Sequence, residues 1–341
     1  MGNLITSVPA LGTSEYEIFI KPLLDDPQIN QLPMSFTVGN MPREIFFNDN
    51  LDKITGAGAA CDISESSNGV AFTKKTLTPI ELKTKLSQCY SVVLGKLFGK
   101  DLPDGAMRGE LTPEVIDFMI TQMKYAFNRD LLTFLLLGDT AATPDNYYSL
   151  IDGVYTKLKA GSVTAEADGT KVVDAGALTS TTTNTTNFFA TMNAVYNSQS
   201  RALKRVAKAD KRWIWTEALY DQYLNYLEVA TQNTAGIVQS QFVTDGLTPT
   251  SFKGIPIAVV GIVDERMEED AIFQSGSPLA VTYPYRAILT TATNHIIYMD
   301  NTAFQNVDVF QDKPNDKVIA RASALLAYEY GYGELNVIAG F

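Results

Sequence analysis

One long helix, expected over residues 112–138, constrains the fold of this chain more than any other segment. Thr112 is a suitable N-cap, Pro113 suits the first helical position, and Gly138 is a typical C-terminal stop. Apolar side chains recur between these ends at steps of three and four residues: Ile116, Met119, Ile120, Met123, Phe127, Leu131, Phe134 and Leu135. At about 1.5 Å per residue the helix would be roughly 40 Å long. A rod of this length favours an extended subunit over a compact globule.

The composition is that of a folded protein with rather few charges. Of its 341 residues, 45% are hydrophobic and 19% are charged, and the formal net charge is −11. Excess negative charge argues against a dedicated nucleic-acid-binding protein, which presents a basic face, but it does not prevent the chain from enclosing nucleic acid. The two cysteines, Cys61 and Cys89, match no zinc or redox spacing and are expected to be reduced.

The sequence contains no targeting or membrane signal. No lysine or arginine precedes Lys21 and no long apolar block follows the first residue, so a signal peptide is not expected. No run approaches the roughly 20 apolar residues that span a bilayer. We therefore expect a soluble protein made in a cytoplasm, without a membrane partner.

The first 78 residues are expected to form extended structure outside the main core. Residues 1–35 are broken by four prolines and are expected to be an arm that lies on another surface. Residues 36–78 have strand-like ends, SFTVG and GVAFTKKTL, around a middle rich in Gly, Ala, Asn and Ser. We interpret them as a long projecting hairpin. Because an isolated hairpin is only marginally stable, a neighbouring subunit is expected to complete it.

The remainder of the chain alternates between helical and strand patterns. Residues 150–161 predict a short helix or turn, residues 187–209 a second helix, and residues 213–216 a buried strand after which Thr216 caps a third helix. FKGIPIAVVGIV is expected to be a central strand entered through a glycine, and two further strands should join near Thr291–Asn294. The run KVIARASALLAYEYG mixes strand and helix signals. The predicted class is α+β.

No constellation of residues indicates catalysis, a cofactor or a metal. The single histidine, His295, lies in an apolar run and is interpreted as structural. Neither a nucleophile elbow nor a phosphate-binding P-loop occurs. The acidic run DERMEED (264–270) lacks the alternating spacing of a calcium loop and is interpreted as a solvated loop. We therefore expect no enzyme activity and no cofactor.

A basic segment is the most unusual charge feature of this acidic chain. Arg201, Lys204, Arg205 and Lys208 are expected to share one helical face, and Lys211 and Arg212 follow just beyond it. Three interpretations stay open: an ordinary exposed face, a salt-linked contact with an acidic patch on a neighbouring subunit, or direct contact with phosphates.

The order of these segments resembles one known family. Its recurrent pieces look like LLGD (136–139), LIDGVYTKLKAG, the helix NFFATMNAVYNSQSRALKRV, WIWTEALYDQYLNYLE, FKGIPIAVV, YRAILTTATNHIIYMD and the terminal ARASALLAYEYGYGELNVIAGF. Together they resemble the major capsid proteins of tailed bacteriophages, which have the HK97-type fold. The resemblance implies an N-terminal arm (1–35), an extended loop (36–78), a peripheral domain (79–182) with the 112–138 helix as its spine, an axial domain (183–283), and peripheral strands that return over 284–341.

The same resemblance implies a function in a virion. Subunits of this family form hexamers and pentamers that tile an icosahedral shell around double-stranded DNA, without sequence-specific binding. The resemblance also implies assembly in the host cytoplasm with a portal, a separate scaffold protein and, in some relatives, decoration proteins. One relative is crosslinked through a lysine of its extended loop, so Lys53, Lys74 and Lys75 are candidates for contacts between subunits. The other candidates for contacts between subunits are Arg201, Lys204, Arg205 and Lys208.

Three other functions remain open from the sequence. The same fold serves encapsulin-type bacterial nanocompartments, and a neighbouring portal or terminase gene would favour the phage. An enzyme on an unfamiliar α+β scaffold would need a pocket with perturbed carboxylates. An extracellular adhesin would need secretion, for which the sequence offers no signal.

Overall fold

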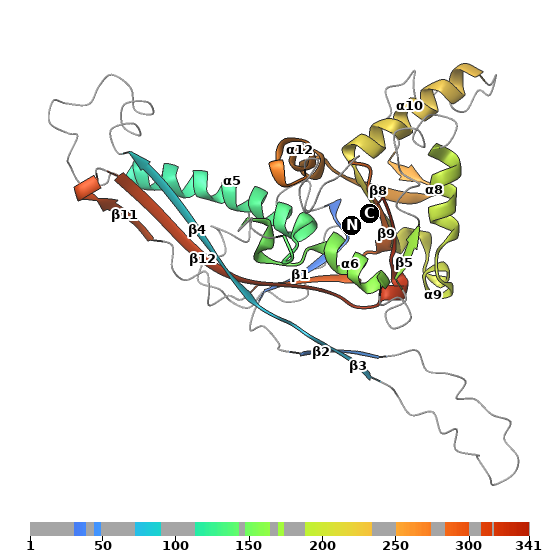
Figure 1. Cartoon of the computed structure of the whole chain (residues 1–341), viewed down its shortest axis with the longest axis horizontal. Helices are drawn as coiled ribbons and strands as arrows, with labels where there is room; N and C mark the ends of the chain where they lie inside the picture. The colour runs from blue at the N-terminus through green and yellow to red at the C-terminus, as the bar shows by residue number, and fades with distance from the viewer. Residues whose placement is uncertain are drawn as a thin grey trace, which may run out of the picture.

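The fold is that of an elongated α+β protein, as Figure 1 shows. The computed structural model describes the residues in the following ranges: 31–38, 44–48, 72–89, 113–142, 147–163, 170–173, 188–233, 250–273, 284–299, 308–315 and 317–340. Cys61, Lys53, Thr112 and the predicted arm up to residue 30 lie outside the described residues.

A five-stranded sheet runs along the long axis of the molecule. Its strands are β1 (Met34–Val38), β4 (Ile80–Cys89), β10 (His295–Met299), β11 (Asp308–Asp312) and β12 (Lys317–Tyr330). The 14-residue β12 is central, because β4 pairs along one side of it while β10 and β11 pair with its two ends on the other. These pairings are antiparallel, and β1 joins β10 in parallel. The mixed signals of the run after Lys317 therefore resolve into a strand.

The predicted long helix is confirmed as α5 (Pro113–Leu137), which lies along one face of this sheet (Figure 1). The apolar stripe accounts for the packing, since Met119, Met123, Leu131 and Leu135 are fully buried or nearly so in the core that α5 shares with β12. The short helix α6 (Val154–Val163) follows and packs beside α5.

Two glycines allow the end of α5 and the start of α6 to meet backbone to backbone. Gly153 donates its N–H to the carbonyl of Gly138 over 2.8 Å. A Cβ on Gly138 would lie 2.1 Å from the carbonyl oxygen of Ile151, and one on Gly153 would lie 2.8 Å from that of Phe134. Gly138 thus ends the helix as predicted, and the reason is close approach of backbone rather than a left-handed conformation.

A second, six-stranded sheet forms the other lobe. In spatial order its strands are β5 (Lys171–Val173), β13 (Val337–Ala339), β9 (Ala287–Thr291), β6 (Lys211–Thr216), β8 (Ile255–Val260) and β7 (Ser251–Phe252). Helices of this lobe are α8 (Phe188–Asn197), α9 (Arg201–Arg205) and α10 (Glu217–Asn233). The helix α12 (Gly261–Glu269) follows β8 and packs against both α5 and α10. Single 3-10 turns occur at Tyr148–Leu150, Lys208–Asp210, Ala271–Phe273, Lys313–Asn315 and Gly333–Leu335.

An aromatic core fills the space between this sheet and the helices α8 and α10. Trp213 and Trp215 are two residues apart on β6, so both side chains lie on the face of the sheet toward these helices. The rings of Phe188, Tyr223 and Phe252 contact them edge-on or tilted, with ring centroids about 6 Å apart. The buried strand predicted at 213–216 is confirmed. The strand beginning at Ile255 is also confirmed, and it is entered through a two-residue turn at Lys253 and Gly254, both with positive φ. It ends at Val260, because residues 261–263 start α12.

The projecting hairpin differs from the prediction in its first strand. SFTVG does not pair with the GVAFTKKTL segment, because β1 joins β10 in the five-stranded sheet instead. The hairpin is formed by β2 (Glu44–Asn48) and β3 (Phe72–Thr76), which pair only with each other among the described strands. Figure 1 shows them below the main body.

Candidate assembly site

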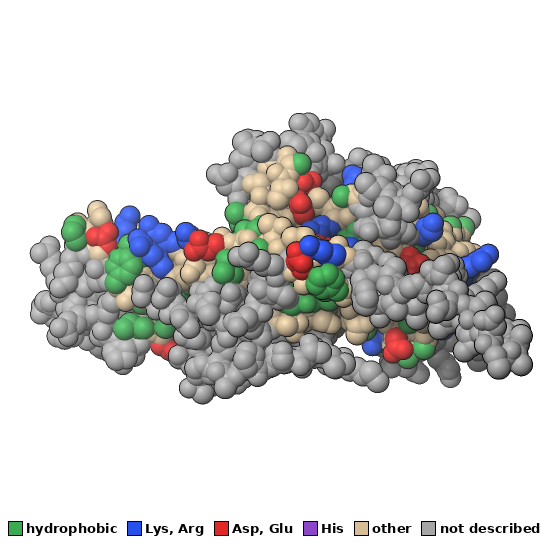
Figure 2. Space-filling view, turned by 90° about the horizontal axis from the view of Figure 1, so that it is seen from below, with side chains coloured by type: hydrophobic (Ala, Val, Ile, Leu, Met, Phe, Trp, Pro, Cys, Tyr) green, Lys and Arg blue, Asp and Glu red, His purple; other side chains and the backbone are tan. Residues whose placement is uncertain are grey.

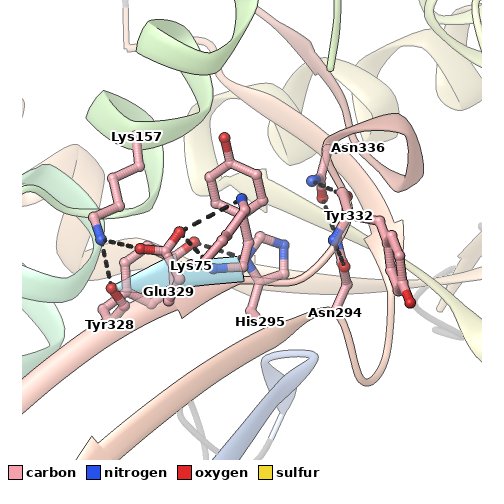
Figure 3. Close-up of polar contacts among 9 residues, drawn as sticks. Lys75, Lys157, Asn294, His295, Tyr328, Glu329, Tyr332 and Asn336 are labelled. Carbon is pink, nitrogen blue, oxygen red and sulfur yellow. Dashed lines mark hydrogen bonds and ion pairs between the residues drawn. The ribbon is translucent and has the colours of Figure 1, made fainter. Parts of the chain in front are cut away.

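The described base of the hairpin is attached to the main body through Lys75. The ammonium of Lys75 lies 3.7 Å from a carboxylate oxygen of Glu329 and 3.7 Å from the ring centroid of Tyr330, both on β12 (Figure 3). The Lys75 and Glu329 side chains are only 14% and 12% exposed, so their ion pair is shielded from solvent. Lys74, the preceding residue of β3, forms an ion pair with Glu44 of β2, and both side chains are exposed.

Glu329 holds a second cation. Lys157, on α6, donates to the other carboxylate oxygen of Glu329 over 2.8 Å and to the carbonyl of Tyr328 over 2.6 Å (Figure 3). The carboxylate thus accepts one charge-assisted hydrogen bond, from Lys157, and forms a longer ion pair with Lys75 in a shielded position. Glu329 therefore joins three segments that are far apart in the sequence: the hairpin, α6 and β12.

A buried chain of hydrogen bonds begins next to this ion pair. His295 is fully buried; its Nδ1 lies 2.7 Å from the Tyr328 hydroxyl and its Nε2 lies 3.0 Å from Oγ1 of Thr290. Because Thr290 donates its own proton to Asn336, the imidazole must donate from Nε2 and accept at Nδ1. Burial lowers the pKa of His295 to about 4, so the ring is neutral at pH 7. His295 is the first residue of β10, directly after the turn that was predicted at 291–294.

Two asparagines extend the chain across the junction between the sheets. Asn294 lies in the turn from β9 to β10, and Asn336 lies in the connection from β12 to β13; each connection leads from one sheet to the other. Asn294 donates to Asn336 and to the carbonyl of Tyr332, and it accepts from the Tyr332 N–H over 2.8 Å (Figure 3). These bonds hold the two connections together, which fixes how the lobes meet. The predicted turn at 291–294 is confirmed, but it joins strands of different sheets.

The basic segment does not form the single helical face that was predicted. The helix expected over 187–209 is interrupted after Asn197, and α9 is a separate helix. Ser200 causes the new start, because its hydroxyl accepts from the Leu203 N–H over 2.9 Å and donates to the carbonyl of Glu334. Lys208 lies beyond the end of α9 and donates to the carbonyl of Lys253.

The cations of this segment have different environments. Arg201, Lys204 and Arg205 are exposed on α9 and form no ion pair with the described part of the chain. Lys211 is buried instead; it donates to the Gln199 side chain over 2.8 Å, and burial lowers its pKa. Arg212 donates to two nearby carbonyls. Only the α9 residues remain as an available basic face.

The acidic run at 264–270 is not the solvated loop that was predicted. It forms most of α12, and its first carboxylate is buried. Asp264 accepts from the N–H groups of Glu217 and Ala218 at 2.6 and 3.2 Å and so caps α10 from another helix. Thr216, the predicted cap, uses its hydroxyl to accept from the Arg286 N–H. Burial raises the pKa of Asp264 to about 6, and the two backbone donors oppose that rise.

Surface charge is mixed elsewhere. Figure 2 shows basic side chains gathered toward one end of the underside. Lys85 and Arg321 are exposed and lie opposite each other on β4 and β12, and the exposed Lys83 lies two residues along β4. Across the described ranges, no three His, Cys, Asp or Glu side chains gather where a metal ion could be held. Among the described helices, none has the length and apolar character that a membrane crossing requires.

Glu329 was missed by the sequence analysis, although a signal was available. It is a lone acid between two tyrosines in a strand that is otherwise mostly apolar, and a carboxylate in that setting needs a partner. The sequence could not name Lys75 and Lys157 as the partners, since both are more than 170 residues away. Of the seven candidate lysines and arginines, Lys53 lies outside the described residues, and Lys74 and Lys75 lie on β3. The other four lie on α9 or, for Lys208, just beyond its end.

Solved structures share the fold of this chain, whereas comparison of its sequence with family profiles and curated proteins finds no match. A chain of the satellite phage P4 procapsid, which includes the size determination protein, matches with a TM-score of 0.55 and 11% identity over 98% of this chain and 92% of that chain. A chain of Mycobacterium phage Ogopogo matches at 0.51 and 13% identity over 98% and 93%. A chain of Gordonia phage Cozz matches at 0.53 and 11% identity over 90% and 83%. At these identities the likeness is one of fold, and this chain has a phage capsid fold.

Proposed function

We propose that this chain is the major capsid protein of a tailed phage, whose copies assemble as hexamers and pentamers into an icosahedral shell around double-stranded DNA. The observation that carries the proposal is the shared fold over nearly the whole length of both this chain and the P4 procapsid chain. A shell built in this way would be assembled in the host cytoplasm with a portal, a separate scaffold protein and decoration proteins. The role is structural rather than enzymatic.

The exposed hairpin supports assembly as the function. A two-stranded sheet is marginally stable alone, and β2 carries Phe46 with 61% of its surface exposed. A neighbouring subunit would bury Phe46 and complete the hairpin. The candidate contacts at Lys53, Lys74 and Lys75 belong to this same proposal. Lys75 has its ion pair with Glu329 in its own chain, so its contribution would be to hold the hairpin in place.

The phage is favoured over the nanocompartment by the source of the matching structures. The three counterparts given above come from a satellite phage and two phages. The net charge of −11 also suits a wall that must not trap the DNA it encloses.

Electron microscopy of the purified protein, expressed alone and together with its neighbouring genes, tests the proposal. We expect closed polyhedral shells, hexamers or pentamers, with DNA inside particles from the complete gene set. Phe46→Ser should leave the circular dichroism spectrum unchanged and reduce the yield of shells. Tyr125→Ser is the matched control, because it removes a similarly exposed aromatic side chain from α5. Monomers under every condition would contradict the proposed function. Shells of the Phe46→Ser variant at full yield would contradict the role of the hairpin in assembly.

A further inference from the structure

We propose that the basic face of α9 binds the acidic face of α12 on a second copy of this chain. The inference rests on the proposed shell function and names one contact that would build the shell. It also decides among the three interpretations of the basic segment, in favour of a salt-linked contact between subunits.

The basic side of the contact is a compact, anchored patch. Arg201, Lys204 and Arg205 stand at positions i, i+3 and i+4 of α9, so they lie together on one face of a single helical turn. Ser200 fixes the helix in place through its bonds to Leu203 and Glu334. Three like charges so close together repel one another, which a partner of opposite charge would relieve.

The acidic side has the same spacing. Glu265, Glu268 and Glu269 also stand at i, i+3 and i+4, and all three are exposed on the face of α12 opposite its buried residues. The basic residue in this helix, Arg266, pairs with Asp270 at 3.7 Å, and Glu265 is the one residue of the acidic face whose charge raises the pKa of Arg266. Two single-turn patches of equal extent and opposite charge can therefore meet face to face, carboxylate against cation.

The positions of the two helices require that the contact be made between copies. In Figure 1 α12 lies at the upper margin of the molecule and α9 at the lower margin of the second lobe, well apart in the plane of the view. They cannot meet within one chain. A contact between two different patches is head-to-tail, and such contacts close into rings when the rotation between subunits permits. Hexamers and pentamers are rings of this kind.

Charge reversal and rescue test the contact in the full-length protein. One variant carries Arg201→Glu, Lys204→Glu and Arg205→Glu, a second carries Glu265→Lys, Glu268→Lys and Glu269→Lys, and a third combines all six changes. We expect each triple variant to need about tenfold more protein for half-maximal assembly, measured by light scattering, because like charges would then face each other. The combined variant should recover assembly, and the defects should shrink as salt is added.

A matched control separates a specific contact from an effect of net charge. Lys83, Lys85 and Arg321 are also exposed, and reversing these three to Glu gives the same change in net charge. The α12 triple variant should not rescue this control. Equal rescue of both, or no rescue of the α9 variant, would overturn the contact. Shells that form normally from the α9 variant but lack nucleic acid would overturn it in favour of phosphate binding. If the unmodified protein forms no rings or shells at all, the proposed function fails instead.

Discussion

Asp264 allows a test of how burial controls the stability of this subunit. Its carboxylate is 7% exposed, and its pKa is raised from 3.8 to about 6 because burial disfavours the charged form. Glu217 and Glu268 add to the rise, and the two N–H groups at the start of α10 oppose it. The native state therefore binds the proton of Asp264 more tightly than the unfolded state does.

The sign and size of the pH effect follow from this shift. Since the native state holds the proton more tightly, Asp264 favours folding more as the pH falls from about 6 toward 3.8, and its ionisation costs stability at neutral pH. A shift of roughly two pKa units corresponds to about 3 kcal/mol. Asp264→Asn cannot ionise, yet its carbonyl can still accept a hydrogen bond from α10. The free energy of unfolding of the variant, minus that of the unmodified protein, should thus be about 2.5 kcal/mol larger at pH 7.5 than at pH 4.

Urea unfolding of unassembled subunits, followed by the fluorescence of the buried Trp213 and Trp215, measures this difference. The comparison of two proteins is essential, because other groups such as His295 titrate in the same range and cancel in the difference. Glu265→Gln is the control, since it removes an exposed carboxylate from the same helix and should give a flat difference. A flat difference for Asp264→Asn, or one that grows toward pH 4, would refute the reasoning.

Three further changes test other parts of the structure. Gly138→Ala should lower the free energy of unfolding by about 2 kcal/mol or more, because its Cβ would lie 2.1 Å from an opposing carbonyl oxygen. Gly261→Ala is the control and should be tolerated, because its Cβ would meet only a movable carboxylate. Thermal unfolding of the two variants measures the difference. Glu329→Gln should cost about 1–3 kcal/mol and speed limited proteolysis of the hairpin, whereas Glu81→Gln, in an exposed pair, should do neither. His295→Gln should reduce the loss of stability between pH 6.5 and 4 by up to about 3 kcal/mol, since the buried imidazole has a pKa near 4 and resists protonation in the native state; parallel pH profiles would contradict this.

Local sequence patterns were sufficient to predict the elements whose ends are marked by characteristic residues. The helix α5 could be predicted because its apolar stripe, its initial proline and its final glycine all agree. The break between α8 and α9 was missed because apolar residues continue at helical spacing through it, up to Leu203. The competing signal was Ser200, whose hydroxyl can start a new helix.

Pairings between distant segments could not be predicted from the sequence. β1 looked like one arm of the hairpin, yet it pairs with β10, more than 250 residues later. A five-residue apolar strand has no feature that identifies a partner so remote in the chain. The Glu329 ion pairs and the Asp264 cap were hidden for the same reason, since each joins residues from elements that only the folded chain brings together.

The position of β12 and β13 in their sheets determines when this chain can fold. β12 is the central strand of the five-stranded sheet, and β13 lies inside the six-stranded sheet between β5 and β9. They are the last of the described strands in chain order, so neither sheet can close before residues 317–339 have been synthesised. Both sheets therefore gain their closing strand late and within one short stretch of the chain, residues 317–339.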